Sequence, residues 1–209
     1  MAIKMTTKER IIEEALTLFS NKGVKGTSVK KIAEAVGIKD SSIYKHFTSK
    51  QEILDAIVGQ VSTRITSLSV TLGMNGEGNQ QKEAKLFGSL SLQGLQELSR
   101  QFLLFYLQDE FISRFWRLAI MEQYHNVTFY DKYRHIFMEE SLTYLTKVFS
   151  EMIKQKYFYE TDPEVLAMNF YTPIFFMLSK YSGRPDHVQE ALLILDKQVA
   201  EFHKCYFRK

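Results

Sequence analysis

The sequence of 209 residues contains very little cysteine and proline. Its one cysteine, Cys205, cannot form an intramolecular disulfide, so nothing indicates an oxidising compartment. The longest strongly apolar runs, such as residues 102–107, are far too short to span a bilayer, and the first ten residues lack the apolar segment of a signal peptide. We therefore expect a cytoplasmic protein that is neither exported nor bound to a membrane.

The motifs of common enzyme classes are also missing. The sequence has no G-x-G-x-x-G, no P-loop, no H-E-x-x-H and no nucleophile elbow. Glu122 and His125 have the Glu-x-x-His spacing of di-iron bundles, but such sites need a second copy and two further glutamates. His187, His203 and Cys205 show no zinc-binding spacing. We assign no catalytic residue, no metal site and no cofactor, and a helical enzyme is only our third hypothesis.

Helical periodicity dominates what is present. Apolar residues recur at helical spacing, whereas strand alternation and hairpin dipeptides are absent from residue 86 onward. Three of the ten glycines fall within residues 71–81, which we interpret as a linker. The sequence predicts an all-α protein of about nine helices, the longer ones at residues 7–22, about 50–70, 82–107, 109–124, 127–157, 162–182 and 186–207.

Residues 28–50 indicate a helix-turn-helix. The first short helix has an apolar face, and Gly37 follows its last periodic residue, where a left-handed residue usually ends a helix. A second short helix, at about residues 41–47, places Ile43 and Phe47 on the core side and leaves polar side chains outside. Two short helices joined by a tight glycine turn are typical of a motif whose second helix enters the DNA major groove.

The distribution of charge favours the same interpretation. The chain has a net charge of only +3, but residues 1–50 carry ten Lys and Arg residues against five acids, which is +5. The other 159 residues therefore carry −2. A basic head on a nearly neutral body suits a protein that binds a polyanion, because Lys and Arg release counterions when they meet phosphates.

The N-terminal motifs together resemble one known family. They are Lys22-Gly23, Gly26-Thr27-Ser28-Val29, residues 32–38 (IAEAVGI), residues 42–47 (SIYKHF) and Lys50-Glu52-Leu54. This pattern is similar to the TetR/AcrR family of bacterial transcriptional regulators. The resemblance implies a DNA-binding head at residues 1–50, a ligand-binding and dimerisation body at residues 51–209, and a connector helix at about residues 50–70. It also implies a palindromic DNA operator as partner.

Position in the family's motif gives the expected DNA-binding residues. Ser28, Ser42, Tyr44, His46 and Lys50 are expected at phosphates, and Asp40, Ser41 and Lys45 nearest base edges, with Thr27 and Lys39 beside them. Asp40 departs from expectation, because a carboxylate repels phosphate unless it caps the helix or accepts a hydrogen bond from cytosine.

The body is rich in aromatic residues, most of which we expect to be ordinary core. Pockets between helices that combine aromatic walls with a few polar tips are nevertheless common ligand sites. The resemblance implies a small-molecule inducer in such a pocket, for which we expect a hydrophobic or aromatic compound. The candidate ligand-binding residues are Phe105, Trp116, Gln123, Tyr124, His125, Tyr133, Phe137, Asn169, Tyr171 and Pro173. Pro173 predicts a kink around either a cavity or a neighbouring helix.

The last helix is apolar on two sides. Leu193 and Ile194 lie off the stripe that continues through Leu195 and Val199, so either the body surrounds this helix or a second subunit covers it. The resemblance implies a homodimer through the last two helices. The leading hypothesis is therefore a dimeric repressor released from DNA by a ligand. The alternative is a DNA-binding protein of the same fold whose body contacts a protein partner.

Overall fold

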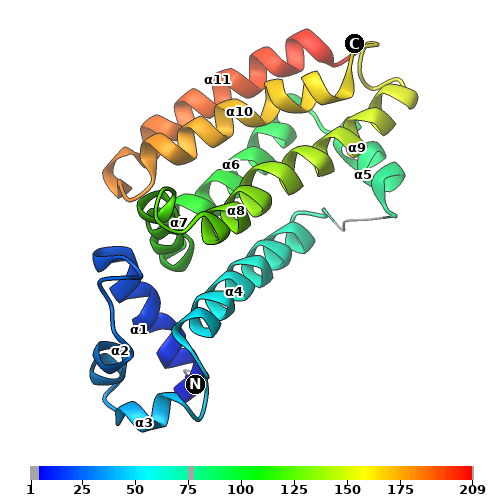
Figure 1. Cartoon of the computed structure of the whole chain (residues 1–209). Helices are drawn as coiled ribbons and strands as arrows, with labels where there is room; N and C mark the ends of the chain where they lie inside the picture. Colours follow the sequence, from blue (N-terminus) through cyan, green and yellow to red (C-terminus); the bar gives the residue numbers. More distant parts are fainter. Residues whose placement is uncertain (1–4, 75–77, 209) are drawn as a thin grey trace. The chain divides into compact units, whose positions relative to one another are not determined.

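The computed structural model describes residues 5–74 and 78–208, and the chain there is all-α, as predicted (Figure 1). An isolated bridge between Phe158 and Phe207 is the only β pairing among the described residues. No helix in these two ranges has the length and hydropathy needed to cross a membrane. The helices are α1 Thr7–Lys22, α2 Val29–Val36, α3 Asp40–Ile43, α4 Lys50–Thr71, α5 Gln80–Gly88, α6 Leu92–Gln108, α7 Glu110–Glu122, α8 Val127–Arg134, a π-helix His135–Glu139, α9 Glu140–Lys154, α10 Pro163–Tyr181, a 3-10 helix Pro185–His187 and α11 Val188–Tyr206.

The chain forms two compact units. The first contains the residues up to Arg64 together with Glu110–Tyr133, and the second contains Ile65–Asp109 and the residues from Arg134 onward. This partition differs from the predicted division at residue 50, because α7 packs against α1 and so belongs with the N-terminal helices. Helix α4 contributes residues to both units.

Local sequence signals explain the start of the first unit. Thr6 caps α1, since its hydroxyl accepts from the amide of Glu9 and the Glu9 carboxylate accepts from the amide of Thr6, at 3.3 and 2.7 Å. The buried face of α1 includes Ile11, Ala15 and Phe19, which are fully shielded from solvent. The predicted helix at residues 7–22 is thus confirmed.

The second unit is built from α5, α6 and the long helices α9, α10 and α11. Helix α11 packs against α6 and α10, and α9 packs against α5 and α10. The predicted single helix at 82–107 is wrong, because the chain leaves the helix at Gly88 and begins α6 at Leu92. Ser91 caps the new helix by accepting from the amide of Gly94 at 3.2 Å.

Of two other predicted helices, that at 127–157 differs in detail and that at 162–182 is confirmed as α10. Residues 127–154 are helical throughout, but a π-helical segment separates α8 from α9. Pro173 lies inside α10 without ending it. Asp162 caps α10 through the amides of Glu164 and Val165, and Pro163 occupies its first turn, as its missing amide proton allows.

Candidate nucleic-acid interface and interior cavity

The helix-turn-helix geometry follows from three residues. Ser28 caps α2 by accepting from the amide of Lys31 at 3.2 Å. Gly37 ends α2 in the left-handed conformation, with φ 75° and ψ 38°, and the amide of Ile38 donates to the carbonyl of Ala33. The chain therefore reverses sharply before α3, which makes a single turn from Asp40 to Ile43.

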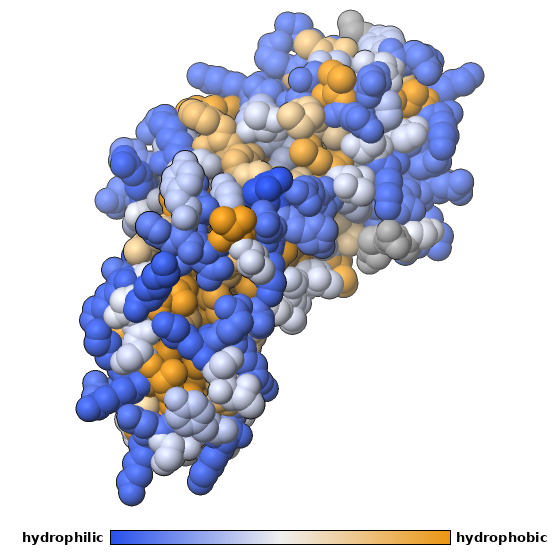
Figure 2. All heavy atoms as spheres, in the orientation of Figure 1, coloured by the Kyte–Doolittle hydropathy of each residue, from blue (hydrophilic) through white to orange (hydrophobic). Residues whose placement is uncertain are grey.

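Most of the predicted DNA-binding side chains are accessible. Ile43 and Phe47 are buried and fix α3 and the following turn to the core of the first unit, as the periodicity predicts. The end of this unit that carries α3 is covered mainly by hydrophilic side chains on the face shown in Figure 2. The exposed candidates are Ser28, Lys39, Asp40, Ser41, Tyr44 and Lys45, and the half-buried ones are Ser42 and His46.

Two predicted DNA-binding residues are turned inward instead. Thr27 is buried, and its hydroxyl donates to the carbonyl of Gly23 at 3.0 Å. The ammonium of Lys50 donates to the carbonyls of Val24 and Thr27, at 2.6 and 3.1 Å. Both side chains hold the loop between α1 and α2, so the structure gives them a supporting position rather than a free surface.

The same loop is held by a residue that the sequence did not single out for this role. Glu122, at the end of α7, is buried, and its carboxylate accepts from the amide of Val24 at 2.9 Å. Gly23 lies so close that a Cβ atom there would stand 3.2 Å from the same carboxylate oxygen. A buried carboxylate is costly unless it is hydrogen-bonded, so this contact ties the loop to α7.

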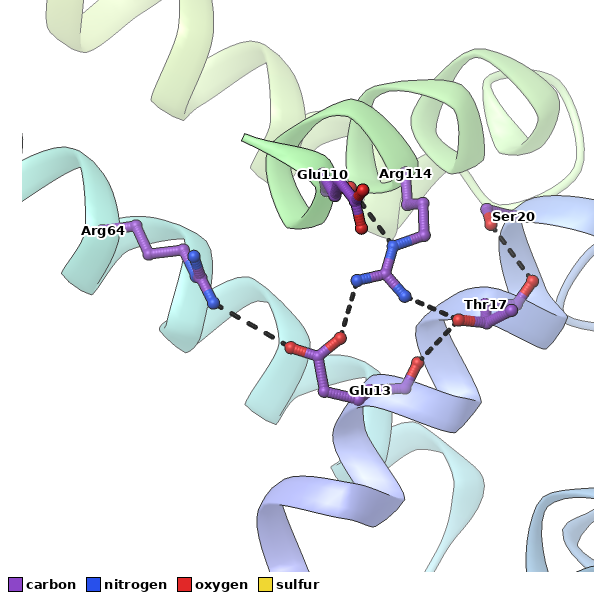
Figure 3. Close-up of polar contacts among 6 residues, drawn as sticks. All are labelled: Glu13, Thr17, Ser20, Arg64, Glu110 and Arg114. Carbon is purple, nitrogen blue, oxygen red and sulfur yellow. Dashed lines mark hydrogen bonds and ion pairs between the residues drawn. The ribbon is translucent and has the colours of Figure 1, made fainter. Parts of the chain in front are cut away.

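A polar network joins α1, α4 and α7 within the first unit (Figure 3). The guanidinium of Arg114 donates to the Glu13 carboxylate and to the Thr17 hydroxyl, each at 2.6 Å, and to the carbonyl of Glu110 at 3.2 Å. Arg64 approaches the other oxygen of Glu13 at 3.9 Å. Arg114 lies 97 and 101 positions from Thr17 and Glu13 in the sequence, so no local signal predicts these two contacts.

The second unit contains a cavity of about 330 Å³ that is partly open to solvent. Its walls come from α4, α5, α6, the π-helix, α9, α10, α11 and the segments near Phe158 and Phe207. Phenylalanines dominate the apolar lining: Phe87, Phe102, Phe149, Phe158, Phe170, Phe202 and Phe207. This size and composition are typical of a small-molecule site between helices.

Of the ten predicted ligand-binding residues, Tyr171 alone is part of the lining. Its hydroxyl donates to the carbonyl of Phe137, and burial raises the pKa of Tyr171 to about 12. Phe137 and Phe105 pack against Tyr106, with ring centroids 5.7 and 5.3 Å away, behind the wall.

The remaining candidates lie elsewhere. Five belong to the first unit, because that unit includes Glu110–Tyr133: Trp116, Gln123, Tyr124, His125 and Tyr133. Trp116 and Tyr133 are core residues in edge-to-face contact, whereas Tyr124 is 85% exposed. Asn169 and Pro173 line a more open surface groove between α10 and α11, where the Asn169 amide donates to the Tyr206 hydroxyl at 2.8 Å.

The N-terminal region matches known proteins. Residues 11–57 match the sequence model of the bacterial regulatory proteins of the tetR family. Over 51 residues the chain is 49% identical to IcaR, the negative transcriptional regulator of the biofilm operon icaADBC in Staphylococcus aureus. That match covers 24% of this chain and 27% of IcaR, so the chain spans only about a quarter of the length of this relative.

The complete fold has relatives among solved structures. A regulator from Mesorhizobium loti assigned to the TetR family aligns with a TM-score of 0.69, covers 97% of both chains and is 21% identical. The triclosan complex of SmeT, a repressor from Stenotrophomonas maltophilia, aligns with a TM-score of 0.71 over 98% of this chain and 93% of SmeT, at 18% identity. These likenesses extend the agreement in fold to both units. Over residues 11–57, the chain therefore matches the N-terminal domain of the tetR family of bacterial regulatory proteins.

Proposed function

We propose that the protein is a homodimeric DNA-binding repressor that acts in the cytoplasm and leaves a palindromic operator when a small molecule occupies the cavity. The observation that carries this proposal is the surface of α2, α3 and the following turn. There Ser28, Tyr44 and Lys45 are accessible while Ile43 and Phe47 anchor the surface from beneath. Hydroxyl, phenol and ammonium groups donate hydrogen bonds to phosphates and to base edges.

Within this surface, α3 is the element that we place in the major groove. Lys45 and Ser41 are exposed and lie nearest the groove floor in our assignment, and Tyr44, 57% exposed, lies at the phosphates. Asp40 is in the first turn of α3, and Lys39 before it makes no side-chain cap. We assign Asp40 to base discrimination, where it would accept a hydrogen bond from a cytosine amine.

The proposed dimer uses α10 and α11. Large apolar side chains are exposed on these two helices: Val165, Met168, Phe176, Leu193 and Ile194. Phe176 and Leu193 are 62 and 63% exposed, which is unusual for side chains of this size on adjacent helices. A two-fold dimer matches a palindromic operator, whose half-sites would lie about 34–36 Å or a multiple of that apart.

The ligand part of the proposal is supported by the mainly apolar cavity of the second unit. Triclosan, an aromatic compound, is bound by SmeT, whose fold this chain shares. Helix α4 begins beside the helix-turn-helix and its later residues, including Ile65 and Ser69, line the cavity. A ligand that prefers one position of α4 would alter DNA affinity by its difference in affinity for the two states, about 1–3 kcal/mol for a typical coupling.

The experiment has two stages. Selection of duplexes from a random library should recover an inverted repeat, and light scattering should give a dimer at micromolar concentration. Binding of a cavity ligand is then measured with and without the selected operator. By reciprocity the operator should weaken ligand binding as much as ligand weakens DNA binding, roughly 5- to 150-fold. If the inverted repeat is recovered but the ligand binds equally well with and without the operator, induction is refuted. That result would favour a protein partner for the second unit.

A further inference from the structure

The hydroxyl groups that line the cavity differ in whether they already donate a hydrogen bond within the protein. The Ser99 hydroxyl donates to the carbonyl of Leu95 at 2.8 Å, and the Tyr144 hydroxyl donates to the Glu83 carboxylate at 2.9 Å. The Tyr171 hydroxyl donates to a backbone carbonyl, as described above. These three hydroxyl hydrogens therefore stay with the protein when a ligand arrives.

Among the cavity hydroxyls that remain, those of Thr66, Ser69 and Ser141 belong to exposed or half-buried residues, whereas Tyr106 is buried. It comes from α6, is 6% exposed, and its ring lies 4.8 Å from that of Phe102 and 5.7 Å from that of Phe137. Within the described part of the chain no residue hydrogen-bonds its hydroxyl. Burial raises the pKa of Tyr106 well above its ordinary value, so the group remains an O–H donor at neutral pH. A donor that faces the cavity without a protein partner is satisfied by water or by an acceptor on a bound molecule, so it is available to a ligand that displaces the water.

Charge in the cavity wall restricts the ligand further. Glu140 is the one charged side chain among the described residues that line the cavity. It is 59% exposed and pairs with His135 at 3.1 Å, so it belongs to the solvent-facing rim. An anionic ligand would lie among phenylalanines with no cation to pair with, and a cationic ligand would find no buried carboxylate in the wall. Either charge would be desolvated without compensation.

We propose that the cavity takes an uncharged, aromatic-rich molecule with one hydrogen-bond acceptor, and that Tyr106 is the specificity-determining donor to this acceptor. The proposal rests on the proposed function, in that it concerns the same ligand site. It adds that ligands with a carboxylate or a sulfonate group do not bind in the cavity. It also names Tyr106 as the hydrogen-bond donor to the polar group of the ligand. The apolar rings of Phe102 and Phe170 would then cover the aromatic part.

The charge rule is tested with two dyes that share one ring system. N-phenyl-1-naphthylamine is uncharged, and 8-anilino-1-naphthalenesulfonate adds a sulfonate. Each dye is used to displace prodan, a neutral naphthalene ketone whose fluorescence rises in apolar sites. The assay measures the loss of cavity-bound prodan, so dye that binds to the exposed surface does not contribute to the signal. We expect the neutral dye to displace prodan at least tenfold more effectively. Equal or better displacement by the sulfonate, or failure of prodan and the neutral dye to bind, would overturn the proposal.

The role of Tyr106 is tested by Tyr106→Phe, which removes only the hydroxyl. Prodan carries a carbonyl whose emission moves to longer wavelength when it accepts a hydrogen bond. The variant should bind prodan about three- to tenfold more weakly, with emission at shorter wavelength, since a neutral hydrogen bond is being lost. It should bind N-phenyl-1-naphthylamine, which lacks the carbonyl, as the wild type does, and this also verifies that the cavity is intact.

Ser99→Ala is the matched control, because it deletes a cavity hydroxyl that is already bonded to its own helix. It should leave prodan affinity and emission unchanged. Unchanged prodan binding and emission in Tyr106→Phe would remove Tyr106 from the proposal. Failure of the proposed function can be distinguished from failure of this proposal. If an uncharged probe binds in a Tyr106-dependent way but does not release DNA, induction is refuted and the assignment of the ligand site stands.

Discussion

Replacement of Arg114 by Met should selectively destabilise the first unit. The guanidinium makes three hydrogen bonds, two of them to side chains of α1 at 2.6 Å, and both it and the Glu13 carboxylate are about three-quarters buried. Hydrogen bonds to charged groups contribute roughly 1.5–3 kcal/mol when lost. Arg64, 3.9 Å from Glu13, still partly compensates the carboxylate. We therefore expect the free energy of unfolding to fall by about 2–3 kcal/mol. This loss is smaller than the sum expected for the separate hydrogen bonds, because Arg64 remains near the Glu13 carboxylate.

The assay uses the single tryptophan of the chain, Trp116, which lies on α7 in the core of the same unit. Urea unfolding followed by its fluorescence reports on the first unit. Arg117→Met is the matched control, since Arg117 is exposed on the same helix and makes one hydrogen bond of 3.3 Å to Asn21 on α1. Its cost should stay within about 0.5 kcal/mol.

A double-mutant cycle of Arg114→Met with Glu13→Gln isolates the pair. A coupling energy of about 1–2 kcal/mol is expected for a partly buried, well-aligned contact. Equal costs for Arg114→Met and Arg117→Met, or a coupling energy near zero, would refute the view that this network fastens α7 to α1.

Four further predictions concern other parts of the chain. Lys50→Ala should lower the stability of the first unit by about 1–2 kcal/mol in urea, because its ammonium holds two loop carbonyls. Leu193→Glu should give monomers in light scattering if the proposed dimer forms through α10 and α11, since a carboxylate would be buried unpaired in that interface. Gly88→Ala should cost about 1–3 kcal/mol on thermal unfolding, because its Cβ would stand 2.3 Å from an aromatic ring, whereas Gly59→Ala, in open space inside α4, should be neutral or stabilising. Hydrogen bonds from the Tyr181 hydroxyl, His187 and Lys180 lower the pKa of Glu190 from 4.5 to about 2. Its stabilising contribution should therefore be complete above pH 4.5 and lost as the pH falls to 2, so the difference between wild type and Glu190→Gln should vanish there.

Local signals in the sequence were sufficient for the helix-turn-helix. The end of α2 at Gly37 and the anchoring of the following turn by Phe47 depend on residues only a few positions apart. Caps and periodicity act over that range, so they predict such elements well. The break between α5 and α6 was missed because helical apolar spacing continues across it, and the cap at Ser91 is a single weak signal.

The residues of the candidate sites could be predicted from the sequence only where the position of a residue on its own helix determines whether its side chain is exposed. Periodicity shows that one face of α7 is buried, but it does not show that the face packs on α1, which needs the pairing of Glu13 with Arg114 across the sequence. Trp116 was therefore expected in a ligand pocket and lies in the core of the first unit. Thr27 was expected at DNA for its place in a motif, and only the folded loop shows that its hydroxyl is used internally.

The most direct test of the central claim is the affinity of the selected operator for wild type, Lys45→Ala and Lys82→Ala over a series of salt concentrations. Lys45 is exposed beside α3, and Lys82 is an exposed lysine on α5 that carries the same charge. Lys45→Ala should lose about 1–3 kcal/mol on the operator and much of its discrimination against unrelated duplexes, while Lys82→Ala should match the wild type. Equal behaviour of the two variants would contradict the assignment of the α3 surface to DNA recognition.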